Sequence, residues 1–330
     1  MTLISVLGAA RRLGGRPPFQ LRGSYERLLE GRLDLQIVAA TRAQAQQAEH
    51  DALNELERLG RVLGAQDPHS EWRRWLRQAS SAPTPLSLDL TAVLRLADHW
   101  RLRSGGALHP GAEALGLLWA QAERTGRPPA PQELQRLVSA VQGAPWTLQA
   151  DGCAVLHARG PLGLGPLARG YMVDRAAAVA SRAAGVRWVQ VRAGGALRVV
   201  GPGSVTVTVA DPFTARDNAP WLARVRVRRG ALAQRPAPAP GSAPLVNPRT
   251  GCPAAPAPGV VVLAPECAAA EALATILSVL DVRGGLALVD STPGCAALVV
   301  TPDGRRHPSR AWPRRDHPPG GAQGHEDQPG

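Results

Sequence analysis

The sequence predicts an α+β fold with mixed or antiparallel sheets. Along the chain, the predicted helices and strands are segregated as much as they alternate. The first half of the 330-residue chain carries stretches with apolar residues at helical spacing. The second half is richer in β-branched and alternating stretches. Hydrophobic residues make up 44% of the chain, which is enough to bury the core of one large or two medium domains. Such segregation favours an α+β fold over a doubly wound parallel sheet.

The first half predicts a strand followed by helices that begin at recognisable caps. Thr41 and Ser87 are suited to cap helices, and Pro131 to the first turn of one. In order, the predicted elements are a strand at 33–39, a helix after Thr41, a turn at 67–76, a helix from Ser87, a glycine-hinged loop at 103–110, and a helix from Pro131 to Gly143.

The second half predicts five strands interrupted by two helices. The strands are expected at 187–193, 204–211, 223–229, 259–265 and 296–304, and the helices at 171–185 and 267–280. Three further segments complete the predicted organisation. A poorly defined segment covers 1–24, a single domain covers 25–312 with an irregular Pro/Ala-rich loop at 234–258, and a disordered tail covers 313–330.

The chain is strongly basic, and all of its basic residues other than histidine are arginine. Its net charge is +12, and it contains no lysine, which excludes Schiff-base chemistry and a P-loop lysine. A positive field could attract nucleic acid. The arginines are spread along the chain, however, and no nucleic-acid-binding motif is present. We therefore expect no nucleic-acid partner, and an arginine-rich nucleic-acid binder is the less favoured alternative.

Cysteine usage and the N-terminus predict a cytoplasmic protein without a membrane span. The cysteines are Cys153, Cys252, Cys267 and Cys295; none forms a CxxC pair or a zinc-site spacing. The N-terminus lacks the basic region of a signal peptide, and no apolar stretch is long enough to cross a bilayer.

Five segments, taken together and in order, carry a resemblance to a known family. They are SGGALHP (104–110), LGPLARGYMVDRAA (164–177), VRAGGALRVVG (191–201), LVNPRTGCP (245–253) and AEALATILSVL (270–280). Their order, spacing and content resemble the ApbE family, the FAD:protein FMN transferases, over most of residues 25–305. Each segment alone is a weak signal, but five in the right order are specific.

The resemblance implies an ApbE-like fold with FAD in a cleft between its two halves. It also implies Mg²⁺ on the pyrophosphate, and transfer of FMN from FAD to a Thr hydroxyl of a target flavoprotein. Metal ions and backbone amides in glycine-rich turns are both suited to a pyrophosphate. Many family members are periplasmic or membrane-anchored, in contrast to the cytoplasmic location expected from this N-terminus.

The resemblance also assigns residues to the expected site. Glu271 and Thr275 lie four residues apart on one helix face and would hold Mg²⁺. The residues expected to contact FAD are Ala107, Leu108, His109, Gly163, Arg169, Gly194, Gly195, Arg249 and Thr250.

Several positions depart from the family pattern near the expected chemistry. Pro244 stands at the family's His position and Asn247 at its Asp position, so no catalytic residue is assigned. Arg169 replaces a Lys, and Glu271 replaces an Asp. The family's ATSGDY becomes AQRPAP at 233–238. These departures leave two interpretations open: an active transferase of unusual sequence, and a flavin-binding relative that has lost transfer.

Ordinary structural roles are also open for the same residues. Glu271 could be an exposed helix residue and Thr275 a packed one. Arg169 could be solvated at a helix start, and His109 could be a surface or hydrogen-bonded side chain rather than a catalyst.

Overall fold

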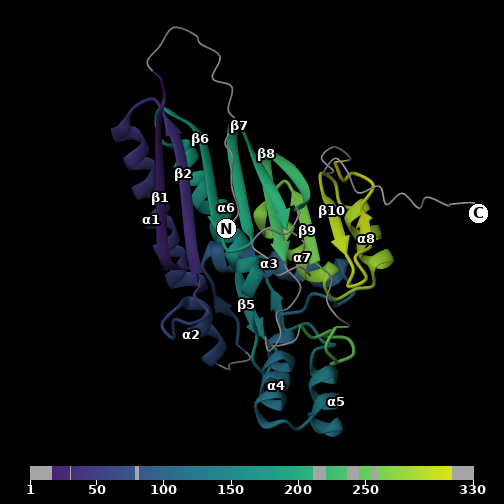
Figure 1. Ribbon diagram of the computed structural model, residues 1–330. Coiled ribbons are helices and arrows are strands. Elements are labelled where there is room, and N and C mark those ends of the chain that lie inside the picture. Colours follow the sequence, from purple (N-terminus) through teal and green to yellow (C-terminus); the bar gives the residue numbers. More distant parts are fainter. Residues whose placement is uncertain are drawn as a thin grey trace, which may run out of the picture.

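The fold is built on one large antiparallel sheet (Figure 1). The computed structural model describes residues 17–29, 31–78, 82–210, 221–235, 245–254 and 259–313. Within them the sheet has eight strands, and every neighbouring pair is antiparallel. In spatial order the strands are β1 (Phe19–Leu28), β2 (Gly31–Ala39), β6 (Val186–Ala193), β7 (Ala196–Ala210), β8 (Trp221–Arg235), β9 (Gly259–Ala264), β10 (Ala296–Val300) and β11 (Arg306–Pro308).

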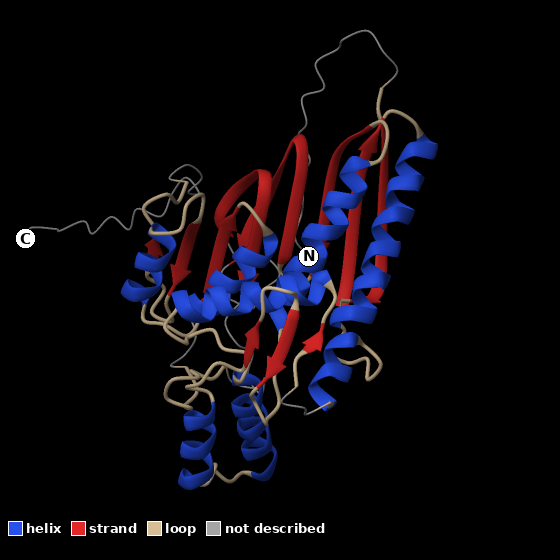
Figure 2. Ribbon diagram, turned by 180° about the vertical axis from the view of Figure 1, so that it is seen from behind, coloured by secondary structure: helices blue, strands red, loops and turns tan. Residues whose placement is uncertain are grey.

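Four helices cover one face of this sheet, as the view from behind makes clear (Figure 2). They are α1 (Arg42–Leu63), α6 (Gly165–Arg182), α7 (Cys267–Leu277) and α8 (Val282–Asp290). Thr41 caps α1 by accepting a hydrogen bond from the Gln44 N–H. Within the described residues, no helix is long and apolar enough to cross a membrane.

The remaining elements form a smaller region at one end of the large sheet (Figure 1). A three-stranded sheet has the order β3 (Thr84–Pro85), β5 (Cys153–Leu156), β4 (Trp146–Leu148). The helices of this region are α2 (Glu71–Arg77), α3 (Leu88–Arg103), α4 (Ala112–Thr125) and α5 (Pro131–Ala140). The last two form an antiparallel helical hairpin that projects away from the sheet (Figure 2).

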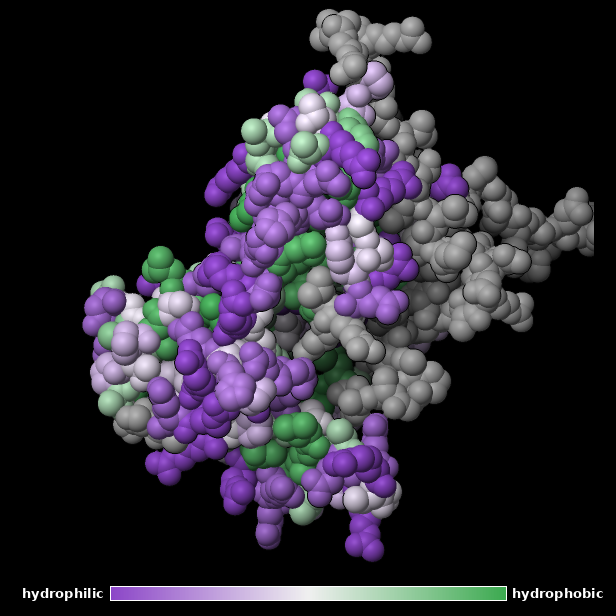
Figure 3. All heavy atoms as spheres, turned by 90° about the vertical axis from the view of Figure 1, so that its left-hand side faces the viewer, coloured by the Kyte–Doolittle hydropathy of each residue, from purple (hydrophilic) through white to green (hydrophobic). Residues whose placement is uncertain are grey.

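The main core lies between the helices and the large sheet. Alternate residues of β2 face it, and Leu33, Leu35 and Ile37 are almost fully buried there. The helical periodicity of α1 buries Ala48, Ala52, Leu56, Leu59 and Leu63 against the same core, as the sequence predicts. The side of the molecule where α1 and β1 lie is mainly hydrophilic, with hydrophobic residues visible in recesses (Figure 3).

The predicted α+β class is confirmed, and the differences concern the ends and number of elements. β7 and β8 are each 15 residues long, well beyond the predicted 204–211 and 223–229. α6 begins at Gly165, six residues before the predicted start, and α5 ends at Ala140, before Gly143. β1, α4 and α8 were not predicted, because their patterns are short or broken by glycine.

The segment predicted as an irregular loop, 234–258, is partly regular. β8 continues through Gln234 and Arg235, where it pairs with β9. Val246 and Pro253 form an isolated antiparallel bridge. Residues 236–244, including Pro244, and residues 255–258 lie outside the described residues, as does the predicted tail beyond residue 313.

Candidate functional site

Two neighbouring cavities lie where α6, α7 and the end of β8 meet. The larger has a volume of about 1090 Å³ and is also bordered by the C-terminal end of α1; Arg169, Gly195 and Glu271 are among its lining residues. The smaller, about 390 Å³, is lined by residues that include Ala107–His109, Gly163 and Thr275. Arg235 and residues 164–166 line both. Most residues expected to contact FAD or metal therefore border one cavity or the other.

A cluster of four polar side chains lies between the two cavities. Arg169 Nη2 is 3.1 Å from each carboxylate oxygen of Glu271, whose side chain is only 5% exposed. Arg235 Nη2 donates to Thr275 Oγ1 over 3.0 Å. Thr275 Oγ1 in turn donates to the backbone oxygen of Glu271 over 2.9 Å. The predicted metal ligands are thus adjacent, as expected, but each faces a guanidinium group.

The electrostatic balance of this cluster is positive. Burial lowers the pKa of the Arg235 guanidinium; the charge of Glu271 opposes this and that of Arg169 adds to it. Arginine nevertheless stays protonated in proteins. The cluster contains two guanidinium groups and one carboxylate, so its own net charge is positive beside the larger cavity.

Sequence reasoning missed Arg235, whose side chain belongs to the polar cluster and which lines both cavities. It lies in the stretch that reads as an irregular loop, where a Pro/Ala-rich composition hides the end of β8. The signal that could have found it is its position inside AQRPAP (233–238), the stretch that stands where the family has ATSGDY.

The α6–α7 contact fixes the position of the cluster. Gly170 lies against the backbone of Ala268 so closely that a Cβ would collide with it. Asp174 accepts the N–H groups of Cys267 and Ala268 at the start of α7, and pairs with Arg198 over 3.1 Å. Burial raises the pKa of Asp174 to about 6 despite these contacts. These motif residues hold the two helices together and do not line either cavity.

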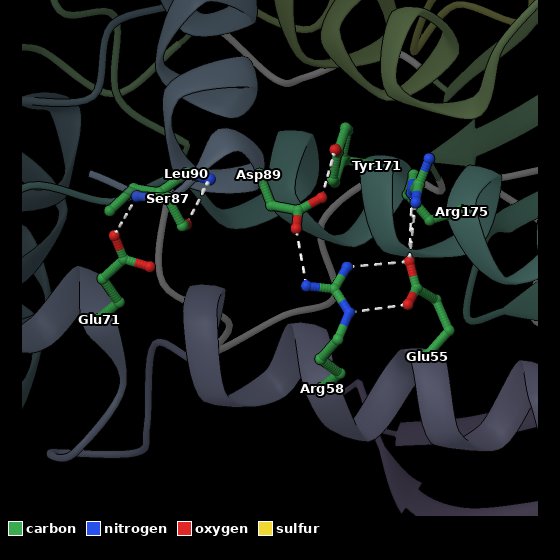
Figure 4. A network of polar contacts seen from close by, with 8 residues as sticks. All are labelled: Glu55, Arg58, Glu71, Ser87, Asp89, Leu90, Tyr171 and Arg175. Carbon is green, nitrogen blue, oxygen red and sulfur yellow. Dashed lines mark hydrogen bonds and ion pairs between the residues drawn. The ribbon is translucent and has the colours of Figure 1, made fainter. Parts of the chain in front are cut away.

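A second polar network joins α6 to α1 and α3 (Figure 4). Arg58 donates to both Glu55 and Asp89, Arg175 pairs with Glu55, and Tyr171 donates to Asp89. The hydrogen bond from Arg58 is the main reason that the pKa of Glu55 is lowered. Tyr171 and Arg175, from the GYMVDR stretch, are therefore structural residues of the helix layer.

His109, in the loop that resembles the family's GGAFDP segment, is buried and fully engaged. Its Nδ1 accepts the Gly111 N–H over 2.9 Å, and its Nε2 lies 3.2 Å from the Gly143 oxygen. These two contacts require a neutral ring, and burial lowers the pKa of His109 accordingly. Its side chain therefore supports the loop, as the structural interpretation anticipates.

Three glycines of the expected site are explained by the space around them or by backbone geometry. The side chain of Glu113 lies beside Gly163, where a Cβ would be 2.7 Å from the Glu113 Oε2 atom. A Cβ on Gly195 would collide with the Gln234 oxygen, which brings the β6–β7 turn against β8. Gly194 has a positive φ of 56° in the same turn and lines neither cavity.

The NPRTG turn is held by hydrogen bonds at the edge of the smaller cavity. Asn247 Oδ1 accepts the Arg249 N–H over 3.0 Å, and Thr250 Oγ1 accepts the Cys252 N–H. Trp119 Nε1 of α4 donates to the Gly251 oxygen over 2.7 Å. Arg249 and Thr250 are exposed and line neither cavity, whereas Leu245 and Val246 line the smaller one. Asn247 thus shapes the turn.

Comparisons with known sequences agree on one family. The family model described as "ApbE family" matches residues 31–299. A curated relative, the FAD:protein FMN transferase of Treponema pallidum (strain Nichols), is 28% identical over 294 residues, which is 78% of each chain.

Solved structures of similar proteins share the fold. The flavin transferase ApbE from Vibrio cholerae has a TM-score of 0.72 at 19% identity, covering 90% of this chain and 99% of its own. The apbe protein from Thermotoga maritima has a TM-score of 0.72 at 20% identity, covering 89% and 97%. The Pseudomonas stutzeri flavinyl transferase ApbE, in its apo form, has a TM-score of 0.72 at 16% identity, covering 90% and 96%.

Proposed function

Because this chain belongs to the ApbE family, we propose that it binds FAD and transfers the FMN half to a Thr hydroxyl of a target flavoprotein. The observation that carries the proposal is the larger cavity, whose lining includes Arg169, Arg235 and Glu271 of the positive cluster. Its volume of about 1090 Å³ lies at the top of the usual range for small-molecule sites, roughly 300–1,000 Å³. A dinucleotide with a charged diphosphate suits both the size and the charge.

The proposed reaction is a phosphoryl-group displacement. The acceptor Thr oxygen attacks the phosphorus on the flavin side of the diphosphate, the anhydride bond breaks, and AMP leaves. The hydroxyl proton passes to a base or to solvent, and the product is a phosphoester between FMN and the target. Positioning and electrostatic stabilisation supply most of the catalysis in reactions of this class. Arg169 and Arg235 are suited to the charge on the diphosphate.

The Mg²⁺ that the resemblance implies does not fit the side chains expected to hold it. Both oxygens of Glu271 face Arg169, and Thr275 accepts from Arg235. Mg²⁺ requires several oxygen ligands in near-octahedral geometry. Within the described residues, no three or more His, Cys, Asp and Glu side chains gather where they could hold a metal ion. We therefore assign no step of the reaction to a metal.

A flavin-binding protein without transferase activity is the second candidate. The observation that favours it is the role of Asn247, whose side-chain oxygen is committed to the turn and carries no charge. A chain of this kind would bind FAD and release it unchanged.

A mass measurement distinguishes the two candidates. The full chain is incubated with FAD and a candidate acceptor flavoprotein, with and without Mg²⁺, and the acceptor is analysed by mass spectrometry. Transferase activity adds the mass of FMN, and an acceptor Thr→Ala variant is the control that abolishes the adduct. FAD binding in a titration without any adduct would support the binding protein instead, and the absence of FAD binding would contradict both.

A further inference from the structure

The strongest feature outside the family's expectations is the pair of arginines at the expected metal position. Arg169 comes from the first turns of α6 and Arg235 from the last residue of β8. The two helix residues they contact, Glu271 and Thr275, are one turn apart on α7. Elements distant in sequence therefore bring two guanidinium groups to the place where the resemblance calls for a divalent cation.

A metal ion and this cluster compete for the same oxygens. Mg²⁺ at Glu271 would have to displace Arg169, which lies 3.1 Å from both carboxylate oxygens. It would also lie beside Arg235, whose contact with Thr275 Oγ1 occupies the second expected ligand. Like charges this close in a partly buried site repel strongly. The arrangement disfavours a dication and leaves the positive charge on the protein itself.

The donors of the pair are not exhausted by these contacts. The contacts described use Nη2 of each arginine, and a guanidinium group carries five N–H donors. The Nε of Arg169 is buried and has no hydrogen-bond partner among the described residues. Both side chains line the larger cavity, so an anion there could receive hydrogen bonds from two sides.

We propose that Arg169 and Arg235 bind the diphosphate of the flavin dinucleotide directly and thereby replace the divalent cation, so that FAD binding is independent of metal. Glu271 and Thr275 then serve as positioning residues that hold the two guanidinium groups in place. This inference rests on the proposed function for one point, which is that the ligand is FAD. The arginine pair itself recognises the diphosphate and not the flavin.

The test measures ligand affinity with the full chain. The dissociation constants of FAD, ADP and riboflavin are determined by titration, once with EDTA and once with Mg²⁺. We expect FAD to bind equally well in both, ADP to bind without metal, and riboflavin, which lacks phosphate, to bind more weakly. Arg235→Gln and Arg169→Gln should each weaken FAD and ADP about tenfold in EDTA, because each loses a charged hydrogen-bond donor, and should leave riboflavin unchanged.

The matched control is Arg32→Gln, which removes the same charge from an arginine that is 69% exposed and lines neither cavity. It should leave all three affinities unchanged. Should one site variant fail to fold, the other and the EDTA titration of the wild type still test the proposal.

Each other outcome has a definite meaning. FAD binding that requires Mg²⁺ would overturn the inference and leave the proposed function standing. Equal binding of FAD and riboflavin, or unaltered FAD affinity in both arginine variants, would also overturn it. ADP binding without FAD binding would support the arginine site and contradict the proposed function, and binding of neither would contradict both.

Discussion

Two polar networks on helix α6 use the same kinds of side chain in opposite ways. The network of Glu55, Arg58, Asp89 and Arg175 contains two acids and two bases, and each charge has an opposite partner (Figure 4). The cluster around Glu271 contains one acid and two bases, Arg169 and Arg235. The first network lines neither cavity, whereas the second lies between both. The balanced network thus lies away from both cavities, and the cluster with excess positive charge lies between them.

The contrast teaches how to separate scaffold from site when both carry motif residues. In a balanced network each charged group already has a partner of opposite charge, and the ion pairs stabilise the fold by linking the helices. An unbalanced cluster beside a cavity retains a desolvated charge, and an ion of opposite sign would offset that cost. On this criterion, nearby residues of α6 have different roles. Tyr171 and Arg175 belong to the scaffold, whereas Arg169 belongs to the candidate site.

The largest expected effect is the loss of stability when the balanced network is broken. Glu55→Ala leaves Arg58 and Arg175 without their shared carboxylate. We expect the free energy of unfolding to fall by about 3 kcal/mol. This value is at the lower end of the range for breaking a buried ion pair, because the Arg58 and Arg175 side chains are 42% and 38% exposed. Urea unfolding measures it.

The control for this variant is Glu57→Ala on the same helix. Glu57 pairs with Arg61 on the surface, and its loss should change the free energy of unfolding by no more than about 0.5 kcal/mol. Equal losses for the two variants would show that the network has no special structural role.

The next effect concerns Asp174, which lies on α6 between the scaffold residues and contacts the helix that carries the site. Its pKa of about 6 in the folded protein lies above its ordinary value of 3.8, so the folded state binds this proton more tightly. Asp174 therefore contributes stability that is complete below about pH 4 and is lost as the pH rises through about 6, on the order of 2 kcal/mol.

Glu55, whose pKa is lowered, contributes in the opposite sense, since its stabilisation is lost as the pH falls. Urea unfolding of the wild type and of Asp174→Asn across this pH range isolates the Asp174 contribution. The wild type should gain stability relative to the variant as the pH falls from about 6 to about 4. A difference that does not depend on pH would contradict the assignment.

The smallest expected effect is at the unbalanced cluster itself. Thr275→Val removes the hydroxyl that accepts from Arg235 while preserving shape, and should lower the free energy of unfolding by about 1 kcal/mol. FAD affinity should fall less than in Arg235→Gln, because the guanidinium group remains. Thermal unfolding and a FAD titration provide the two readings.

Thr125→Val is the matched control for this variant. Thr125 donates to the backbone oxygen four residues earlier, as Thr275 does, but it is exposed on α4. Its loss should leave both readings within error of the wild type. If Thr275→Val behaved in the same way, the contact with Arg235 would have no energetic role.

The sequence by itself determined the α+β class, the start of α1 at Thr41 and the pairing of Glu271 with Thr275 on one helix face. These follow from local rules: a capping hydroxyl, alternation in strands, and the helical repeat. The order of five short segments was also enough to identify the family, because that order does not depend on how they are arranged in space.

Only the tertiary structure decided what surrounds those residues. Arg235 reaches Thr275 because β8 continues into a stretch whose composition suggests a loop, and pairing with β9 imposes the strand. Arg169 reaches Glu271 over a separation of 102 residues because Gly170 permits α6 to lie against α7. Contacts between distant segments depend on packing, which no local pattern encodes, and here those contacts bring two arginines to the residues expected to bind a metal.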